Sequence, residues 1–489
     1  MSQASLITQQ QWQSIGQSDK EGVKATTDKD GLIQQNFAVL ERLLMKLVLH
    51  RSTRSKKTKS TKSVLSTIDE TMDSKRQKIN NATKTASIND VYNEDKKIIH
   101  AKAQLLLYVK RIAELYRNVH YHNLQHATHV TLSANKLIDI LLSCKYNDQK
   151  VDENADSSSE PYTAETFERY LNTFGISEDP LVHFALVFSA LVHDVEHKGL
   201  PNAQLIQEQD KLSFVYINKS VAEQHSIAVA FSILSEPCFN ELRNAIWCSK
   251  YEFAKFRGLV VNLILATDIS SPERTAIGRE KWNTAFSKDP VYLRKSKIHR
   301  RRSEPSTRMS SIMKRDSHKK IPRASETNLS CAALAAVSLA TMKSNAILEQ
   351  LMQIADVAHL MQDWPVFTKW NKKLYDELWA ANLAKRGFDP SKNWCNGQTW
   401  FLENYVIPLS KRINDSGIFG SQGAVFMENA IKNRDRWLVE GEAMTDLMIT
   451  NVSYVSPNFR GDSETSVLDD TTLHRSSGPN RTARTTRAA

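Results

Sequence analysis

The feature that most constrains the fold is a long, mostly apolar stretch at residues 181–192 (LVHFALVFSALV), which runs directly into His193 and Asp194. Because apolar residues occupy every side of a helix built from this stretch, the pattern predicts a buried helix, with Pro180 at a suitable first helical position. Its polar end must be paired or bound to a metal, since burying a lone carboxylate costs free energy. An imidazole beside a carboxylate is a ligand set typical of zinc or another divalent transition ion.

Candidate partners for this pair lie both upstream and downstream. In the segment YRNVHYHNLQHATHV, His122 and His126 stand four residues apart, so a helical turn puts them on one side. Asp356 ends the apolar-periodic run AILEQLMQIAD. Two imidazoles and two carboxylates from separate helices are therefore expected to converge on one metal centre: His126, His193, Asp194 and Asp356.

The composition predicts an all-α protein. The chain has 489 residues, 41% of them hydrophobic, with only 15 glycines and many long apolar-periodic stretches in place of period-2 alternation. No run of about 18 apolar residues is present, which argues against a transmembrane segment, and the N-terminus lacks the pattern of a secretory signal. Five cysteines without paired spacing suit a reducing compartment, so a cytoplasmic location is expected.

Five motifs in a fixed order resemble a known family. The order YHNxxHAxxV, HDVxHxGxxN, LATD, ADVxH and QxxF is similar to that of the class I cyclic nucleotide phosphodiesterase catalytic domain, over roughly residues 88–450. The resemblance implies a compact multi-helix domain with an HD-type metal site. It also implies metal-dependent hydrolysis of 3′,5′-cyclic nucleotides (cAMP, cGMP or both) to 5′-nucleoside monophosphates, which terminates cyclic nucleotide signalling.

The resemblance also assigns roles around the metal centre. Two close divalent ions would supply a bridging hydroxide as nucleophile and neutralise the phosphodiester charge. Zinc is expected at the first site because nitrogen ligands favour it, and Mg²⁺ or Mn²⁺ at a second site that shares Asp194. His122 is the expected general acid for the departing 3′-oxygen. Glu223 has a second interpretation as the capping-box partner of Ser220. The groups expected to order the water around the ions are His197, Glu223 and Thr267.

Gln398 and Phe401 are the candidate nucleotide-binding residues. They stand three apart, so they share a helix face, where an amide reads a purine edge and a ring stacks on the base. The Phe401 ring resembles one side of the aromatic clamp by which the family holds the base, and by spacing from Asp356, Leu374 aligns with the opposite side of that clamp. His359 occupies a position at which family members differ. A glutamine amide that can flip accepts adenine or guanine, so cAMP is favoured and cGMP stays open.

The net charge of +11 is concentrated in low-complexity tracts, at residues 50–63, at residues 294–320 and after Gly478. These tracts lack the stacking aromatics of a nucleic-acid-binding face, so nucleic acid is not the expected partner. They are expected to be solvated and disordered, with tethering to anionic lipid (peripheral membrane association) or RNA as the alternative. The predicted organisation is an N-terminal extension (1–87) with an amphipathic helix at 32–49 and a basic linker, a catalytic domain (88–450) interrupted by a basic insert at about 287–343, and a disordered tail (451–489).

Ser303 in the insert fits a basophilic kinase site, because Arg300 stands three before it and Pro305 two after it. Phosphorylation would add roughly −2 charge and create an anion for a phosphoserine-binding partner. The remaining histidines, including His120, His129 and His183, match no family position and are expected to be satisfied or exposed.

Two other classes of function remain open. An HD-type phosphohydrolase acting on a different phosphoester shares the metal ligands, but has no reason to contain YHN or the Gln-x-x-Phe pair. A catalytically inactive cyclic-nucleotide-binding module would be expected to lack a metal ligand or His122, and all are present.

Overall fold

The computed structural model describes residues 29–66, 76–144, 169–286 and 331–453, with side chains described in 29–53, 95–144, 169–286 and 337–450. Every regular element within these ranges is a helix, which confirms the predicted all-α class.

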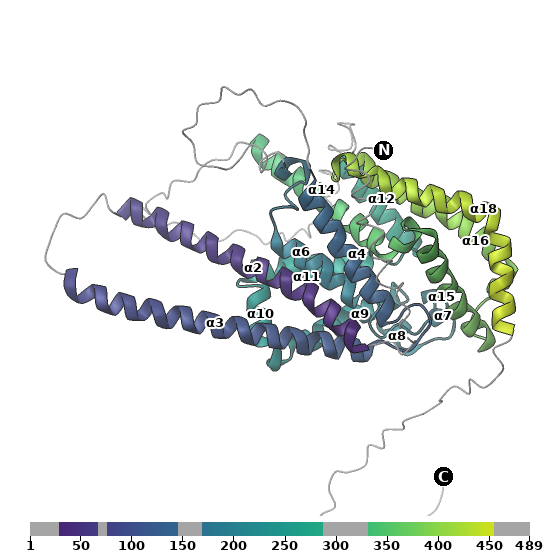
Figure 1. The fold of residues 1–489 in the computed structure, drawn as a ribbon, viewed down its shortest axis with the longest axis horizontal. Coiled ribbons are helices and arrows are strands. Elements are labelled where there is room, and N and C mark those ends of the chain that lie inside the picture. Colours follow the sequence, from purple (N-terminus) through teal and green to yellow (C-terminus); the bar gives the residue numbers. More distant parts are fainter. Residues whose placement is uncertain (1–28, 67–75, 145–168, 287–330, 454–489) are drawn as a thin grey trace, which may run out of the picture.

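Helix α6 (Pro180–Val192) lies at the centre of the helical body (Figure 1), and all its residues from Leu181 onward are buried. The carboxylate of Asp179 caps it by accepting hydrogen bonds from the backbone N–H groups of Leu181 and Val182, and Pro180 stands in the first turn, where its missing N–H costs nothing. Five helices pack around α6: α2 (Lys29–Ser66), α4 (Leu124–Ser143), α9 (Val221–Ser235), α11 (Lys250–Leu265) and α14 (Cys331–Asp356).

Helices α2 and α3 (Arg76–Leu115) form an antiparallel pair that extends beyond the body, at the left of Figure 1. The apolar face of α2, which includes Leu40, Leu43 and Leu44, is buried in the main core. Arg51 then donates hydrogen bonds to the carbonyl groups at the C-terminal end of α10 (Asn240–Ile246). Where the sequence predicted a solvated linker over residues 50–63, the backbone of α2 stays helical to Ser66.

The C-terminal half continues the helical body. Helix α18 forms the long yellow edge of Figure 1. The π-helical turn η4 (Leu402–Val406) inserts one extra residue between α16 (Trp394–Phe401) and α17 (Ile407–Ser416). The remaining elements are α7 (Asn202–Gln207), α8 (Lys211–Val215), η1 (Pro237–Phe239), α12 (Pro272–Phe286), η2 (Ala358–Met361), α15 (Trp364–Leu383), η3 (Pro390–Lys392), α16 (Trp394–Phe401), η4 (Leu402–Val406), α17 (Ile407–Ser416), η5 (Gly420–Gln422) and α18 (Ala424–Ser453).

The boundaries of the basic insert differ from the predicted range of 287–343. Helix α14 begins at Cys331, so the last residues of that range belong to the helical body. The ammonium group of Lys343 lies 4.9 Å from the ring centroid of Phe174 and 5.4 Å from that of Phe286, which joins α14 to the end of α12. Residues 287–330, with Ser303, lie outside the described residues, as does the tail beyond Ser453.

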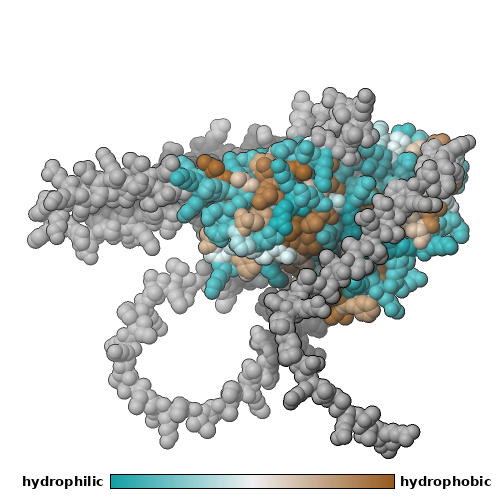
Figure 2. All heavy atoms as spheres, turned by 90° about the horizontal axis from the view of Figure 1, so that it is seen from below, coloured by the Kyte–Doolittle hydropathy of each residue, from teal (hydrophilic) through white to brown (hydrophobic). Residues whose placement is uncertain are grey.

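Within the described part of the chain, none of the helices is both long enough and apolar enough to cross a membrane. Figure 2 shows one face, on which hydrophobic residues gather in separate groups between hydrophilic ones.

Candidate active site

His193 and Asp194 follow directly after α6, at the buried end of the central helix. The Nδ1 atom of His193 donates a hydrogen bond to the carbonyl oxygen of Ala190 (2.9 Å), which fixes the tautomer and aims Nε2 away from the helix. That Nε2 atom is buried and has no hydrogen-bond partner in the described residues. It lies 3.0 Å from Oδ2 of Asp194 and 3.4 Å from Oδ1 of Asp356.

His126 enters the same centre from the first turn of α4. The side chain of Asn123 caps this helix by accepting hydrogen bonds from the N–H groups of Gln125 (2.9 Å) and His126 (3.2 Å). The Nε2 atom of His126 then lies 3.1 Å from Oδ1 of Asp356, at the end of α14, and 3.7 Å from Oδ2 of Asp194. The structure thus brings together all four residues that the sequence singled out as metal ligands.

The spacing of these four ligand atoms fits a metal ion. Donors that each bind one ion at about 2.1 Å lie roughly 3.0–3.4 Å from one another in tetrahedral or octahedral geometry. The separations between the imidazole Nε2 atoms and the carboxylate oxygens run from 3.0 to 3.7 Å, and the ligand atoms of His126, His193 and Asp356 all lie within 4.8 Å of one another. A buried imidazole nitrogen without a partner, facing two carboxylates, is the arrangement that a divalent cation satisfies.

His122 forms an ion pair with Glu377, a residue for which no role was predicted. The carboxylate of Glu377 contacts Nδ1 of His122 and accepts hydrogen bonds from the backbone N–H groups of Tyr121 (2.7 Å) and His122 (3.0 Å). Burial alone would lower the pKa of His122, but the charge and hydrogen bond of Glu377 outweigh it and raise the pKa to about 9. His122 therefore carries a proton at neutral pH.

The approach of Glu377 depends on a glycine in the loop after α6. Gly199 adopts a left-handed conformation (φ +67°), and a Cβ there would lie 3.4 Å from the carboxyl carbon of Glu377 and 3.2 Å from Val119. Glu377 is buried, which would raise its pKa, but the neighbouring charge of His122 lowers the pKa to about 2. Sequence reasoning had no signal for Glu377, because a lone acid on an amphipathic helix looks like a surface residue.

One cavity of about 210 Å³ gathers most of the remaining predicted residues. The amide of Asn202 donates to Glu223 (2.8 Å), while burial, followed by the nearby charge of Asp268, raises the pKa of Glu223 to about 7. The capping-box interpretation of Glu223 is wrong, because Ser220 makes no capping hydrogen bond and instead accepts one from Arg274 (3.2 Å). The predicted residues that line the cavity are His122, His197, Glu223, Thr267 and Leu374, and Glu377 joins them.

The other predicted nucleotide-binding residues do not line this cavity. His359 is buried in an aromatic cluster, with its Nε2 atom 3.5 Å from the hydroxyl of Tyr121 and its ring beside that of Trp370. Gln398 is buried on α16, and Phe401 stacks on Tyr405 with ring centroids 5.1 Å apart.

Three histidines, His120, His129 and His183, were expected to lie outside the site and to be either hydrogen-bonded or exposed. His120 is exposed, and His183 is buried with its Nε2 atom hydrogen-bonded to the carbonyl of Ile176 (2.8 Å), both as expected. His129 differs, because it is buried against Trp370 and its Nε2 atom has no hydrogen-bond partner in the described residues.

Comparison with known proteins identifies the class to which this fold and site belong. A model of the 3′5′-cyclic nucleotide phosphodiesterase family matches residues 121–417, which include every predicted metal ligand. The chain belongs to that family, as the sequence motifs predicted.

Individual relatives match over shorter stretches. The protein named "Probable 3′,5′-cyclic-AMP phosphodiesterase pde-4" of Caenorhabditis elegans is 31% identical over 169 residues, covering 35% of this chain and 20% of the relative. The dual specificity calcium/calmodulin-dependent 3′,5′-cyclic nucleotide phosphodiesterase 1B of Homo sapiens is 37% identical over 86 residues, covering 18% and 16%. The matches thus span a fifth or less of these relatives. The phosphodiesterase domain of Salpingoeca rosetta rhodopsin phosphodiesterase aligns at 17% identity with a TM-score of 0.46, covering 71% of this chain and 83% of that one.

Proposed function

We propose that this chain hydrolyses 3′,5′-cyclic nucleotides to 5′-nucleoside monophosphates. The observation that carries the proposal is the juxtaposition of four metal-ligand side chains with a protonated histidine, His122, which opens onto the adjoining cavity. Family membership supports the same activity.

His126, His193, Asp194 and Asp356 would hold the first ion, for which zinc is the expected metal because two ligands are imidazoles. A second, harder ion such as Mg²⁺ or Mn²⁺ would share Asp194. Divalent ions at such a site lower the pKa of water and neutralise phosphate charge. The polar groups of His197, Glu223 and Thr267 line the cavity beside these ligands and would orient water there.

His122 supplies the proton that the reaction needs. When water attacks phosphorus, the bond from phosphorus to the 3′-oxygen breaks, and the departing oxygen takes up a proton. Glu377 holds Nδ1 of His122 and keeps the ring cationic, so Nε2 is the nitrogen that donates. The same ion pair fixes the direction of the ring.

For the nucleotide base, Leu374 supports the proposal directly because it lines the cavity. Gln398, Phe401 and His359 do not line this cavity, and their proposed contact with the base rests on the sequence motifs. One relative is named for cyclic AMP and another for dual specificity, so both cAMP and cGMP are proposed substrates.

The test is an assay of the purified full chain against cAMP and cGMP, with and without a chelator. We expect turnover that the chelator abolishes and that Asp356→Asn reduces by at least 100-fold, whereas Asp415→Asn, a substitution of an exposed acid, leaves it unchanged. Turnover only of other phosphoesters would favour the HD-type phosphohydrolase, and binding without turnover would favour the inactive module.

Three further predictions rest on the sequence alone. They are phosphorylation of Ser303 by a basophilic kinase, recognition of that phosphoserine by a partner, and a cytoplasmic location with peripheral membrane association through the basic tracts. Incubation of the full chain with such a kinase, followed by mass spectrometry, tests the first, and a Ser303→Ala chain that is labelled equally would contradict it.

A further inference from the structure

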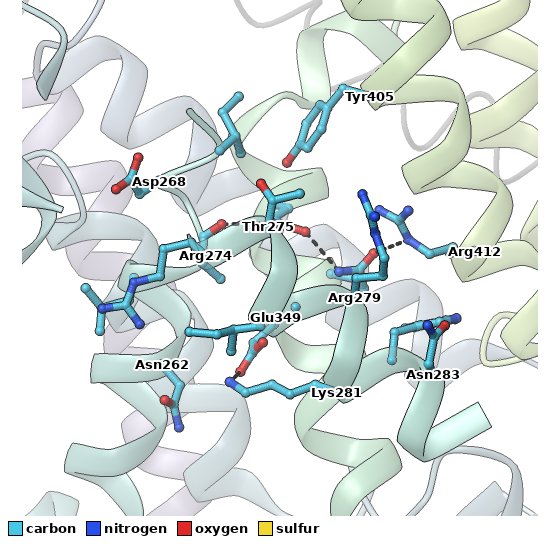
Figure 3. A pocket seen from close by; sticks show the side chains of 18 of the residues that line it. Asn262, Asp268, Arg274, Thr275, Arg279, Lys281, Asn283, Glu349, Tyr405 and Arg412 are labelled. Carbon is cyan, nitrogen blue, oxygen red and sulfur yellow. Dashed lines mark hydrogen bonds and ion pairs between the residues drawn. The ribbon is translucent and has the colours of Figure 1, made fainter. Parts of the chain in front are cut away.

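A second cavity of about 260 Å³ adjoins the candidate active site (Figure 3). Its walls come from the end of α11, from α12, from α14 and from the segment where η4 passes into α17. Asp268 and Ile269 line both cavities, but none of the four metal-ligand side chains lines this one. The two cavities are therefore neighbours with different linings.

The lining of this second cavity is rich in positive charge. Arg274, Arg279, Lys281 and Arg412 face it, against the two carboxylates of Asp268 and Glu349. Glu349 is paired with Lys281. In the described ranges, none of the three arginines forms an ion pair with a carboxylate, and the four cations of the lining outnumber its two carboxylates.

Arg279 and Arg412 lie on the same side of the cavity (Figure 3). Burial lowers the pKa of Arg412, and the positive charge of Arg279 lowers it further, while Tyr405 opposes the shift. Arg412 uses Nε to donate to Gln350 (2.8 Å), and its terminal nitrogens have no hydrogen bond to a described residue. Arg412, which is partly buried, and Arg279, which is exposed, thus present hydrogen-bond donors on the same side of the cavity, an arrangement that an anion stabilises.

An independent observation comes from Tyr405, whose hydroxyl points toward the interior of this cavity in Figure 3. The hydroxyl oxygen is buried and has no hydrogen-bond partner in the described part of the chain. A buried hydroxyl without a partner is energetically unfavourable, so a ligand that accepts its hydrogen bond would be stabilised there. The π-helical turn η4 carries Tyr405, and its ring is held by the stack on Phe401.

We propose that this cavity binds a phosphate-bearing small molecule, either inorganic phosphate or the phosphate group of a nucleotide, at a site separate from the metal ligands. Guanidinium groups match the oxygen geometry of a phosphate dianion and stay charged at every physiological pH. The hydroxyl of Tyr405 adds a neutral donor to the same anion. The inference does not depend on the proposed hydrolysis, because it uses none of the metal ligands.

The test measures phosphate binding to the full chain by isothermal titration calorimetry. A chelator first removes divalent ions, so that phosphate cannot bind through ions at the metal centre. We expect saturable binding to persist. Replacing both Arg279 and Arg412 with glutamine should weaken it at least 10-fold, and Tyr405→Phe should weaken it several-fold. Arg257→Gln, which removes the same charge from an exposed position on α11 outside the cavity, should leave it unchanged. A parallel titration with 5′-AMP distinguishes the sources, since tighter binding than inorganic phosphate identifies a nucleotide site.

Loss of all phosphate binding in the chelator would overturn the proposal, as would equal binding by the double variant. Should the double variant not fold, arginine modification by phenylglyoxal of the wild-type chain gives a second measurement. Phosphate should protect Arg279 and Arg412 but not Arg257, as read by mass spectrometry, and absence of protection overturns the assignment. Hydrolytic activity is not a readout in either experiment, so failure of the proposed function leaves the test intact.

Discussion

The ion pair between Glu377 and His122 makes the most specific prediction about catalysis. Glu377→Gln keeps the size of the side chain and an oxygen that accepts from the N–H groups of Tyr121 and His122. It removes the negative charge beside Nδ1 of His122. The change therefore keeps the acceptor for the two backbone N–H groups and removes both the charge and the acceptor that face Nδ1 of His122.

The size of the effect follows from the pKa of His122. In the folded chain this pKa is about 9, compared with an ordinary value of 6.5, and only 27% of the side chain is exposed. The difference corresponds to about 3 kcal/mol in favour of the charged ring. If the pKa of His122 returned to 6.5, its protonated fraction at pH 7.5 would fall from about 97% to about 9%. Without the charge of Glu377, burial would lower the pKa below 6.5 and make that fraction smaller still.

The assay is the pH profile of kcat/KM for cyclic nucleotide hydrolysis. We expect Glu377→Gln to reduce kcat/KM at least 10-fold at pH 7.5 and by much less at pH 6, where His122 regains its proton. Asp376→Asn is the matched control, because its carboxylate pairs with Lys372 instead. An equal loss at pH 6 and pH 7.5 would refute the claim that Glu377 acts through the proton of His122.

Three further outcomes are expected. Leu44→Ala on α2 should lower the free energy of unfolding by about 2–5 kcal/mol in urea titrations, because this side chain is buried in the main core. The control is Leu49→Ala, at a position 64% exposed, which should change the free energy of unfolding little. Similar values for the two variants would show that α2 is not part of that core. Gly199→Ala should cost about 1–2 kcal/mol and lower activity, because the left-handed backbone and the contact with Glu377 both disfavour a Cβ, and a neutral result in the same titration and assay would contradict the close approach. The stability difference between the wild type and Glu377→Gln should be largest between pH 4.5 and 6.5. It should shrink as the pH falls toward 2, where Glu377 is protonated, and as it rises through 9, where His122 loses its proton, so a difference that is constant from pH 2 to 9 would exclude the ion pair as its source.

Local patterns in the sequence were sufficient to predict the helical class and to single out four candidate metal ligands that the structure brings together. The apolar stretch before His193 predicted the buried helix α6, and the observed burial confirms it. The four-residue spacing of His122 and His126 predicted one helical turn for both, but α4 begins at Leu124, so only His126 is on the helix and His122 lies in the bend before it. Such features are visible in sequence because helix periodicity and capping act over a few residues.

Other features were decided only when distant segments packed together. His122 and Glu377 are 255 residues apart, and no periodicity links them. The same holds for the three arginines and Tyr405, which come from α12, η4 and α17 to line one cavity. His359 was a nucleotide-binding candidate from its position three residues after Asp356, yet packing against Tyr121 and Trp370 buries it. Burial, the pairing of charges and the pKa of a group depend on which surfaces meet in space, and tertiary packing alone determines that.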